Sequence, residues 1–368
     1  MTKAASALAK FAETMQGRYK PERISNGPPP VIIPSGSVST DWALRCGGLQ
    51  EGRLYEIVGP KDSGKSSLAI AAMVSYLRHY PDRGVGYVNM ENTFDPQRAT
   101  AMGLDCSDEA IRAGRWMPML PEHAEHVSDM ARAVVASGVM SLLVVDSIGA
   151  MESAKTLAKE AAKGADSVGR NAKIITQMCK ALSTDARLSQ CTVLLINQPR
   201  ANIGGLGGDI SAGPKLMEHS TTVKIQMRAK FGEEDVRKLK LPGEDEPDVV
   251  SHKVVAKVAR MKNGMPGRAA EFFMNRVATP QYGPPGVDQV DEYVTIGLKA
   301  GAIERKGAWY VLPDGTQKQG RIGFANFLRG EPKYLEAIRE AIVFDAPTNE
   351  YGEPLDGGEA EMATAGAE

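Results

Sequence analysis

The stretch IVGPKDSGKS, residues 57–66, contains the pattern Gly-x4-Gly-Lys-Ser between Gly59 and Ser66. It follows the apolar run LYEIV and opens a run of helical period, which is the context of a phosphate-binding loop. Glycines let backbone N–H groups face phosphate oxygens, while Lys65 offers a point charge and the Ser66 hydroxyl is a Mg²⁺ ligand. We expect a nucleotide to bind through Gly59, Pro60, Lys61, Asp62, Ser63, Gly64, Lys65, Ser66 and Ser67.

Outward from this loop, short apolar runs alternate with longer segments of helical period. The strand-like runs are LYEIVG (54–59), GVGYVNM (84–90), SLLVVDS (141–147), CTVLLINQ (191–198) and TTVKIQM (221–227). This alternation is typical of parallel strands joined by helices, and the unbroken apolar runs indicate central strands covered on both faces. The sequence therefore predicts an α/β fold with a mostly parallel central sheet.

The flanking segments predict separate parts. An apolar seam at helical spacing runs through Leu8, Phe11, Met15 and Tyr19, and a proline-rich tether follows it, so the helix needs a partner in its own domain or in a neighbouring subunit. Beyond residue 277 a Gly- and Pro-containing linkage leads to a compact second lobe, and the last part carries seven acidic residues and no Lys or Arg, typical of disorder. The predicted divisions are 1–35, 36–277, 278–340 and 341–368.

Composition narrows the class of protein. The formal net charge of −1 argues against a uniformly basic coat for nucleic acid, although a local basic groove stays compatible with it. The four cysteines are too scattered for a zinc cluster and too few for a disulfide framework, which fits a reducing compartment. No stretch reaches the roughly 20 apolar residues of a membrane span, and the first residues have no signal-peptide core. The expected location is the cytoplasm, or the host cytoplasm for a phage-encoded protein.

Polar side chains at strand ends supply candidates for chemistry. Asp146 ends an apolar run, where a carboxylate would hold the Mg²⁺ hydration shell or cap the next helix. Glu91 follows another strand and is a candidate base for the attacking water, and Gln198 is a candidate contact to the γ-phosphate. Five glycines lie between residues 201 and 214, so we expect that loop to be ordered by a ligand. The pair His123 and His126 has HxxH spacing without a further ligand cluster in the sequence, which favours a surface helix over zinc.

Five motifs resemble the RecA family of homologous recombinases, which includes phage-encoded members. They are IPSGSVSTDWALRCGGLQEGRLYEIVGPKDSGKSSL (33–68), ENTFDP (91–96), LLVVDSIGA (142–150), LLINQPRANIG (194–204) and AIERKGAWY (302–310). The resemblance spans nearly the whole chain. It implies a RecA-like P-loop ATPase core with an N-terminal polymerisation helix packing on the adjacent protomer and a small α/β C-terminal lobe that captures duplex DNA. It also implies ATP and Mg²⁺ as cofactors, with Ser66 and Asp146 as metal residues.

Further roles follow from the resemblance alone. It implies that Glu91 is the base, that Gln198 senses the γ-phosphate, and that residues 153–171 and 200–214 are the loops lining single-stranded DNA. The implied DNA-binding residues are Val168, Arg170, Lys173, Thr176, Lys180, Arg200, Ile203, Gly213 and Lys215. The segment VARMKNGMPG (258–267) would place Arg260 and Lys262 on a neighbour's ATP. Asp95 and Arg98 would bind the adenine, with the Arg98 guanidinium where the bacterial members carry a stacking tyrosine. His219 stands where the family has an aromatic residue at the subunit interface.

The sequence thus predicts an ATP-dependent recombinase that forms a filament on single-stranded DNA and pairs it with a homologous duplex. Expected partners are single-stranded DNA, duplex DNA, further copies of the chain, and loader, mediator or single-strand-binding proteins, with no membrane. Two alternatives remain open: an ATP-binding mediator or paralogue that does not exchange strands, and a hexameric helicase on the same core. The intact Lys65, Glu91, Asp146 and Gln198 argue against a degenerate paralogue.

Overall fold

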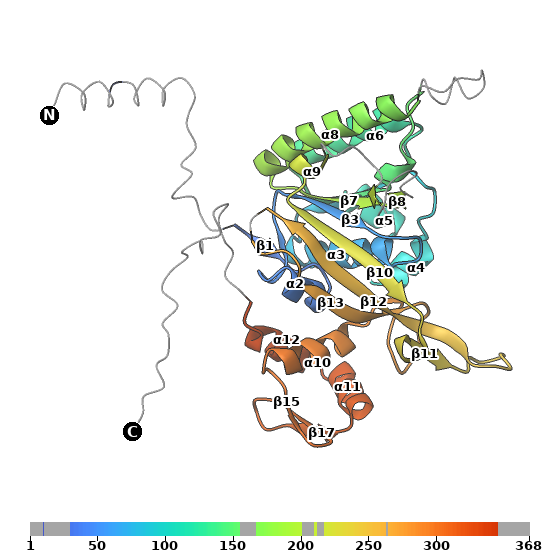
Figure 1. The fold of residues 1–368 in the computed structure, drawn as a ribbon, viewed down its shortest axis with the longest axis vertical. Helices are drawn as coiled ribbons and strands as arrows, with labels where there is room; N and C mark the ends of the chain where they lie inside the picture. The colour runs from blue at the N-terminus through green and yellow to red at the C-terminus, as the bar shows by residue number, and fades with distance from the viewer. Residues whose placement is uncertain are drawn as a thin grey trace. The chain divides into compact units, whose positions relative to one another are not determined.

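The computed structural model describes residues 10, 30–154, 167–200, 210–211, 217–262 and 264–344. The chain divides into two units, residues 1–30 with 355–368, and residues 31–354. Apart from residues 10 and 30, everything described below lies in the second unit (Figure 1). The predicted apolar seam of the N-terminal helix and most of the predicted acidic tail lie outside the described residues.

A ten-stranded sheet forms the centre of the described part, in the order β14-β13-β12-β10-β3-β7-β6-β4-β5 with β11 beside β12. Six neighbouring strands are parallel: β5 (Trp116–Met119), β4 (Gly84–Asn89), β6 (Met140–Asp146), β7 (Thr192–Asn197), β3 (Leu54–Val58) and β10 (Val223–Lys230). The other four run antiparallel to their neighbours: β11 (Val236–Leu239), β12 (Asp248–Met261), β13 (Ala269–Asn275) and β14 (Gly286–Val287). The predicted mostly parallel α/β sheet is confirmed.

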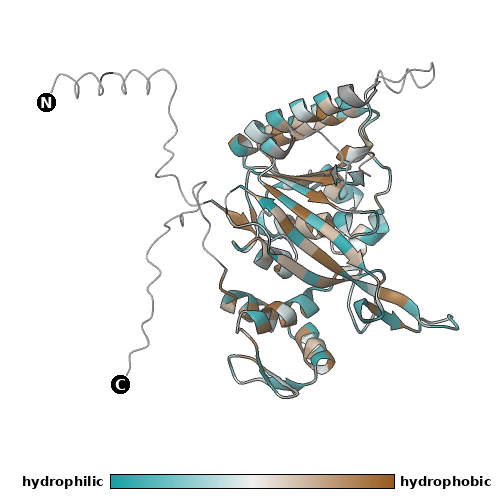
Figure 2. Ribbon diagram, in the orientation of Figure 1, coloured by the Kyte–Doolittle hydropathy of each residue, from teal (hydrophilic) through white to brown (hydrophobic). Residues whose placement is uncertain are grey.

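Two apolar layers enclose this sheet. The helix α3 (Lys65–His79) covers one face, and α6 (Ala124–Ala136) with α8 (Ser167–Ser189) covers the other (Figure 1). Every residue of β3, β6 and β7 is buried, and consecutive residues alternate between layers, so that Val144 joins the first and Val145 the second. Burying one such side chain contributes about 1.5–3 kcal/mol. Figure 2 shows apolar residues on the strands of the central sheet and a mixture of polar and apolar residues on α8.

The register of the parallel strands sets the position of the functional edge. Asn89 at the end of β4 lies beside Asp146 at the end of β6, and Val58 at the end of β3 lies beside Asn197 at the end of β7. Because these strands are parallel, the loops that follow them leave the sheet at one common edge. The phosphate-binding loop and the residues after β4, β6 and β7 therefore meet there.

The C-terminal residues form a smaller apolar cluster of their own around Phe324, Leu328 and Ile338. Its elements are α10 (Gln289–Lys299), β15 (Glu304–Lys306), β16 (Trp309–Val311), β17 (Gln317–Gln319), α11 (Arg321–Gly330) and α12 (Lys333–Ala341). The cluster includes Val38 and is packed by Trp42, both from α2 (Val38–Ala43). This is the small α/β lobe that the sequence predicts.

The remaining described elements are short. They are β1 (Ile32–Ile33), β2 (Leu49–Gln50), α4 (Pro96–Ala101), α5 (Asp108–Arg112), η1 (Ile148–Ala150), β8 (Pro199–Arg200), β9 (Ile210–Ser211), α9 (Met217–Ser220) and η2 (Glu233–Asp235). None of the helices in the described part of the chain is both long and apolar enough to cross a membrane.

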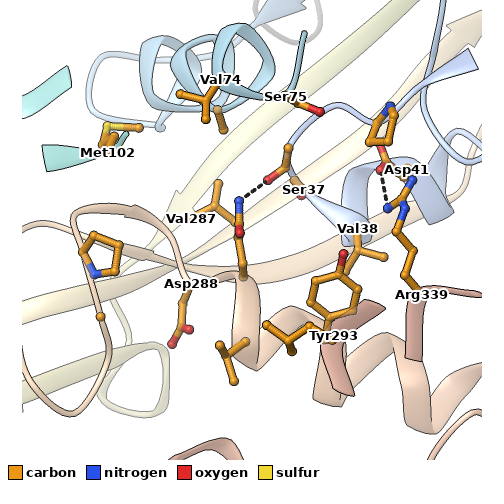
Figure 3. A pocket seen from close by; sticks show the side chains of 18 of the residues that line it. Ser37, Val38, Asp41, Val74, Ser75, Met102, Val287, Asp288, Tyr293 and Arg339 are labelled. Carbon is orange, nitrogen blue, oxygen red and sulfur yellow. Dashed lines mark hydrogen bonds and ion pairs between the residues drawn. The ribbon is translucent and has the colours of Figure 1, made fainter. Parts of the chain in front are cut away.

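A cavity of about 400 Å³ lies where the small lobe meets the core, between α2, α3 and α10 (Figure 3). Asp41 on one wall faces Arg339 on the other, with Oδ2 and Nη1 3.2 Å apart. The lining includes no residue of the phosphate-binding loop. This cavity therefore belongs to the junction between core and lobe and not to the predicted nucleotide site.

Candidate nucleotide and DNA site

The phosphate-binding loop depends on its two glycines. A Cβ on Gly59 would lie 2.4 Å from the carbonyl oxygen of Met227 on β10, so only glycine fits there. Gly64 has φ of +86° and precedes α3, and a Cβ there would lie 2.8 Å from Met274 Cε. Left-handed backbone and close packing on neighbouring strands both exclude larger residues. The loop thus has the backbone shape that the sequence pattern predicts.

Lys65 and Ser66 open α3 at the functional edge. The Lys65 ammonium is mostly buried and donates to the Pro60 carbonyl at 2.6 Å. Burial lowers the pKa of Lys65, while Asp146, Glu91 and Asp62 act to raise it. A desolvated ammonium among carboxylates is suited to a strongly anionic ligand such as a triphosphate.

The Ser66 hydroxyl and the Asp146 carboxylate form the predicted metal pair. Ser66 Oγ donates to Asp146 Oδ2 at 2.7 Å, and the Tyr87 hydroxyl donates to the same oxygen at 2.5 Å. Burial raises the pKa of Asp146, and the hydrogen bonds from Tyr87 and Ser66 oppose that effect. A hydroxyl and a carboxylate oxygen side by side are the hard ligands that Mg²⁺ prefers, so these residues fit that ion.

Glu91 and Gln198 are in direct contact. Gln198 Nε2 donates to Glu91 Oε1 at 2.8 Å, and the Ser147 hydroxyl donates to the same carboxylate oxygen. One oxygen of Glu91 is therefore held by groups from two loops, which follow β6 and β7. The structure brings together the predicted base and the predicted phosphate sensor, and it adds Ser147, which the sequence reasoning missed.

A buried polar chain extends from Gln198 into the sheet. The Gln198 backbone N–H donates to Asn197 Oδ1 at 2.9 Å, and Asn197 Nδ2 donates to Glu56 Oε1 at 2.8 Å. Glu56 Oε2 lies 3.7 Å from Lys224 Nζ on β10. Buried polar groups need such partners. In the sequence, the signal for this polar network was a charged residue inside each of two apolar strand-like runs, Glu56 in one and Lys224 in the other.

The predicted adenine residues lie beside β13. Asp95 caps α4 and accepts from the backbone N–H of Gln97 and of Arg98. The Arg98 guanidinium donates to the carbonyls of Arg276 at 2.5 Å and Asn275 at 3.3 Å. These bonds use the edge of the guanidinium and leave its faces for stacking, so the role at the adenine stays a prediction.

His252 on β12 is a second residue that sequence reasoning missed at this edge. Its ring stacks on Phe231 with centroids 5.0 Å apart, and it is 6% exposed. Within the described residues neither ring nitrogen has a hydrogen-bond partner. Burial lowers the pKa of His252, and Arg276 lowers it further. A buried neutral imidazole with free nitrogens is able to donate to or accept from a ligand.

Arg260 and Lys262 lie at the opposite edge of the sheet from the phosphate-binding loop. The Lys262 N–H donates to the Thr222 carbonyl, and the Thr222 N–H donates to Leu54 at the start of β3. The loop begins five residues later, at Gly59, which corresponds to about 16 Å along a strand. The two side chains instead bond to α9 and the residue that follows it. Arg260 bonds to Thr221, and Lys262 donates to the carbonyl of His219. They do not join their own chain's nucleotide site.

The predicted DNA-binding residues are only partly within the described residues. Lys173 and Lys180 are exposed on α8, whereas Thr176 is buried and its hydroxyl donates to the Ala172 carbonyl. Val168, Arg170 and Arg200 are described by their backbone alone, and Ile203, Gly213 and Lys215 lie outside the described residues. Arg200 in β8 pairs with Ile210 in β9, so the start of the predicted second DNA loop lies beside a residue in its later part.

Comparison with known proteins gives a consistent match. The family described as the RecA N-terminal domain matches residues 29–276. The chain is 31% identical to Protein RecA of Azospirillum lipoferum (strain 4B) over 314 residues, covering 84% of this chain and 79% of that protein. It is 30% identical to Protein RecA of Paracoccus denitrificans over 84% of this chain and 79% of that one. With Protein RecA of Staphylococcus carnosus (strain TM300), identity is 28% over 94% of this chain and 90% of the relative.

Proposed function

The chain belongs to the RecA family of recombinases, and on that premise we propose that it is a DNA-dependent ATPase that forms a filament on single-stranded DNA and exchanges strands with a homologous duplex. Membership of the family implies an ATPase and binding of ATP and DNA in recombination and repair. The observation that carries the finer proposal is the shared Glu91 oxygen, held by Gln198 and Ser147 beside the Ser66 and Asp146 pair.

In this proposal the residues of the loop and the sheet edge divide the chemistry. The backbone of residues 59–67 and the Lys65 ammonium bind the phosphates, with Ser66 and Asp146 holding Mg²⁺. Bound Mg²⁺ supplies charge neutralisation on the phosphate oxygens. The Glu91 carboxylate orients the attacking water and accepts its proton, and Asp95 and Arg98 hold the adenine.

Gln198 connects hydrolysis to DNA. Its amide bonds to Glu91, and two residues later Arg200 begins the predicted second DNA loop. We expect the amide to exchange Glu91 for a γ-phosphate oxygen when the substrate is bound, which would move the start of that loop. Phosphate contacts to the DNA would come from Arg170, Lys173, Lys180, Arg200 and Lys215, and Val168 and Ile203 would insert between bases.

Arg260 and Lys262 would complete the site of the neighbouring subunit. Their side chains bond to Thr221 and His219 and not to their own phosphate-binding loop, and cations at a subunit boundary would stabilise charge that develops on the phosphates. Hydrolysis would then require a filament. We propose that residues 1–35 supply polymerisation contacts, 36–277 form the ATPase core, 278–340 capture duplex DNA, and the acidic residues 341–368 compete with DNA for that lobe.

The experiment that tests this function measures steady-state ATP hydrolysis with and without circular single-stranded DNA, together with joint-molecule formation with a homologous linear duplex. We expect hydrolysis to rise at least about tenfold with DNA and joint molecules to form. Lys65→Ala should abolish both activities, and Lys240→Ala, an exposed lysine on a distant loop, serves as the matched control.

Each other outcome selects an alternative. ATP binding without DNA-stimulated hydrolysis would favour the mediator or paralogue. Stimulated hydrolysis with duplex unwinding, closed rings in electron micrographs and no joint molecules would favour the helicase. Hydrolysis that survives Lys65→Ala would remove the proposed role of the phosphate-binding loop.

A further inference from the structure

Three side chains at the start of α6 lie together on the surface. Glu122, His123 and His126 each offer one ligand atom, and these atoms lie within 4.8 Å of one another. The two imidazole rings have centroids 4.1 Å apart and are inclined by 31°. The sequence showed only the pair of histidines, and the structure corrects that reading by adding a carboxylate to the group.

This group has the composition of a transition-metal site. Imidazole nitrogen and carboxylate oxygen are zinc ligands, and two histidines with one glutamate and an open fourth position is a known zinc arrangement. A tetrahedral zinc site has its ligand atoms about 3.4 Å apart, given Zn–N and Zn–O distances near 2.1 Å. The three ligand atoms already lie within 4.8 Å of one another and Glu122 is exposed, so zinc binding requires the side chains to approach by no more than about 1.4 Å. We propose that Glu122, His123 and His126 bind one zinc ion, with water as the fourth ligand.

A carboxylate already supports the first histidine. His123 Nδ1 lies 3.2 Å from Glu125 Oε2, on the side of the ring away from Nε2. Metal-binding histidines usually donate their other ring N–H to a carboxylate, which fixes the tautomer and the ring orientation. The geometry therefore assigns Nε2 of His123 to zinc and Nδ1–H to Glu125.

The same glutamate is bonded to the start of the first predicted DNA loop. Glu125 Oε2 accepts from the Ala154 N–H at 3.0 Å, and the Ala124 N–H donates to the Glu152 carbonyl at 2.7 Å. Residue 154 is the last described residue before position 167. A zinc ion on His123 would thus strengthen a hydrogen-bonded connection from α6 to residues 152–154. Its effect on DNA, unlike zinc binding itself, rests on the function proposed above.

Zinc would also change the cap of α6. At present His123 Nδ1 accepts from the His126 backbone N–H at 3.3 Å, a long hydrogen bond. A zinc-bound His123 carries its proton on Nδ1, so that contact is replaced by donation to Glu125. The two tautomers distinguish a zinc site from a pair of histidines that only caps a helix.

The test uses the untagged full-length chain, freed of metal with a chelator and then titrated with zinc chloride in a calorimeter. We expect one zinc ion per chain. His126→Gln and Glu122→Gln should each weaken zinc binding by more than about tenfold, and Glu125→Gln by about 10-fold to 100-fold. His79→Gln, a histidine outside the group on α3, is the matched control and should bind zinc like the parent.

Two further readouts separate the site from adventitious binding. Cobalt(II) in place of zinc should give the absorption of a tetrahedral site in the parent and not in His126→Gln. Hydrogen exchange in a peptide containing residues 152–154 should slow with zinc in the parent and not in Glu125→Gln. Equal zinc affinity in the parent, His126→Gln and Glu122→Gln would overturn the proposal, because zinc would then bind elsewhere on the chain.

DNA-stimulated ATP hydrolysis at excess Mg²⁺, with a zinc-selective chelator present, is the separate control on the proposed function. The parent, His126→Gln and Glu122→Gln should hydrolyse ATP equally under those conditions, because none of these side chains contacts the nucleotide site. A chain that binds zinc as expected but lacks stimulated hydrolysis would uphold the zinc site and contradict the proposed function.

Discussion

At the scale of single residues, the candidate site is a set of contacts centred on one oxygen of Glu91. The sequence predicted Lys65 and Ser66 from the Gly-x4-Gly-Lys-Ser pattern. It predicted Glu91, Asp146 and Gln198 from their positions at the ends of strand-like runs. It did not predict Ser147 or Tyr87. A hydroxyl beside a strand end is common, and only the register between β4 and β6 brings these two to their carboxylates.

Ser147 provides the first prediction at this scale. In Ser147→Ala, Glu91 loses one of its two hydrogen bonds and is oriented by Gln198 alone. We expect kcat for DNA-stimulated hydrolysis to fall about tenfold with KM for ATP unchanged, because orientation of a general base acts on the chemical step. Steady-state kinetics at saturating single-stranded DNA measures both parameters.

The control for this prediction is Ser189→Ala. That hydroxyl donates to the Asp185 carbonyl within α8, far from the chemistry, and its removal should leave both parameters unchanged. A Ser147→Ala protein with raised KM and full kcat would show that the hydroxyl contacts substrate instead of positioning Glu91.

At the scale of elements, β12 separates two parts of the chemistry. It runs antiparallel to β10, so Ala256 in its middle lies beside Met227, which is next to Gly59 of the phosphate-binding loop, and its end carries Arg260 towards the opposite edge. Four of the five predicted parallel strands could be recognised because each precedes a helical run or a functional loop, and the fifth, residues 221–227, was recognised from its β-rich composition. The direction of β12 could not be predicted, because the alternating sequence pattern of a strand is the same whichever neighbour it pairs with.

This separation predicts complementation between two inactive variants. Lys65→Ala lacks a working phosphate-binding loop but keeps Arg260, and Arg260→Gln has the reverse defect. Each alone should have almost no DNA-stimulated hydrolysis. In an equal mixture, random order along a head-to-tail polymer gives intact sites at about a quarter of the boundaries, so we expect up to about a quarter of the parent rate.

Hydrolysis is measured on preformed mixtures and on each variant alone at the same total concentration. A mixture whose rate equals the average of the two variants would place Arg260 in its own chain's site or in a purely structural role. The bonds from Arg260 to Thr221 make that structural role the specific alternative.

At the scale of the whole described part, buried charges join the small lobe to the core. Arg237 on β11 pairs with Asp288 at 2.7 Å and with Asp291 at 2.8 Å, and Arg329 also pairs with Asp288. The sequence predicted the lobe from its composition and the linkage before it. It could not predict these pairs, because their partners are more than 40 residues apart and no periodic pattern relates them.

Asp41 at this junction gives a prediction on pH. Burial raises the pKa of Asp41 to about 6, although Arg339 lowers it, because the carboxylate is fully buried while Arg339 keeps some contact with water. A carboxyl whose pKa is higher in the folded state than in the unfolded state binds more protons when folded, so its contribution to stability falls as pH rises from about 4 to 6. The shift corresponds to about 3 kcal/mol.

The comparison of the parent with Asp41→Asn isolates this group. The free energy of unfolding of the parent, relative to that of Asp41→Asn, should rise by up to about 3 kcal/mol between pH 7 and pH 4. Glu292, another buried carboxyl at the junction whose pKa is raised by burial, is present in both proteins, so its contribution cancels except for the smaller part due to the Asp41 charge. Urea unfolding followed by tryptophan fluorescence measures the difference, and Asp245→Asn in an exposed loop is the control. A difference independent of pH would show that the pKa of Asp41 is the same in the folded and unfolded states.

The two edges of the central sheet have a consequence for assembly. β5 contains Pro118, which has no N–H to offer another strand, and β14 at the other edge is only two residues long. Such edges resist the strand-to-strand adhesion that turns crowded β proteins into amyloid-like fibrils. For a protein that concentrates its own copies along DNA, as proposed here, assembly then depends on the reversible contact between subunits. The filament can therefore disassemble.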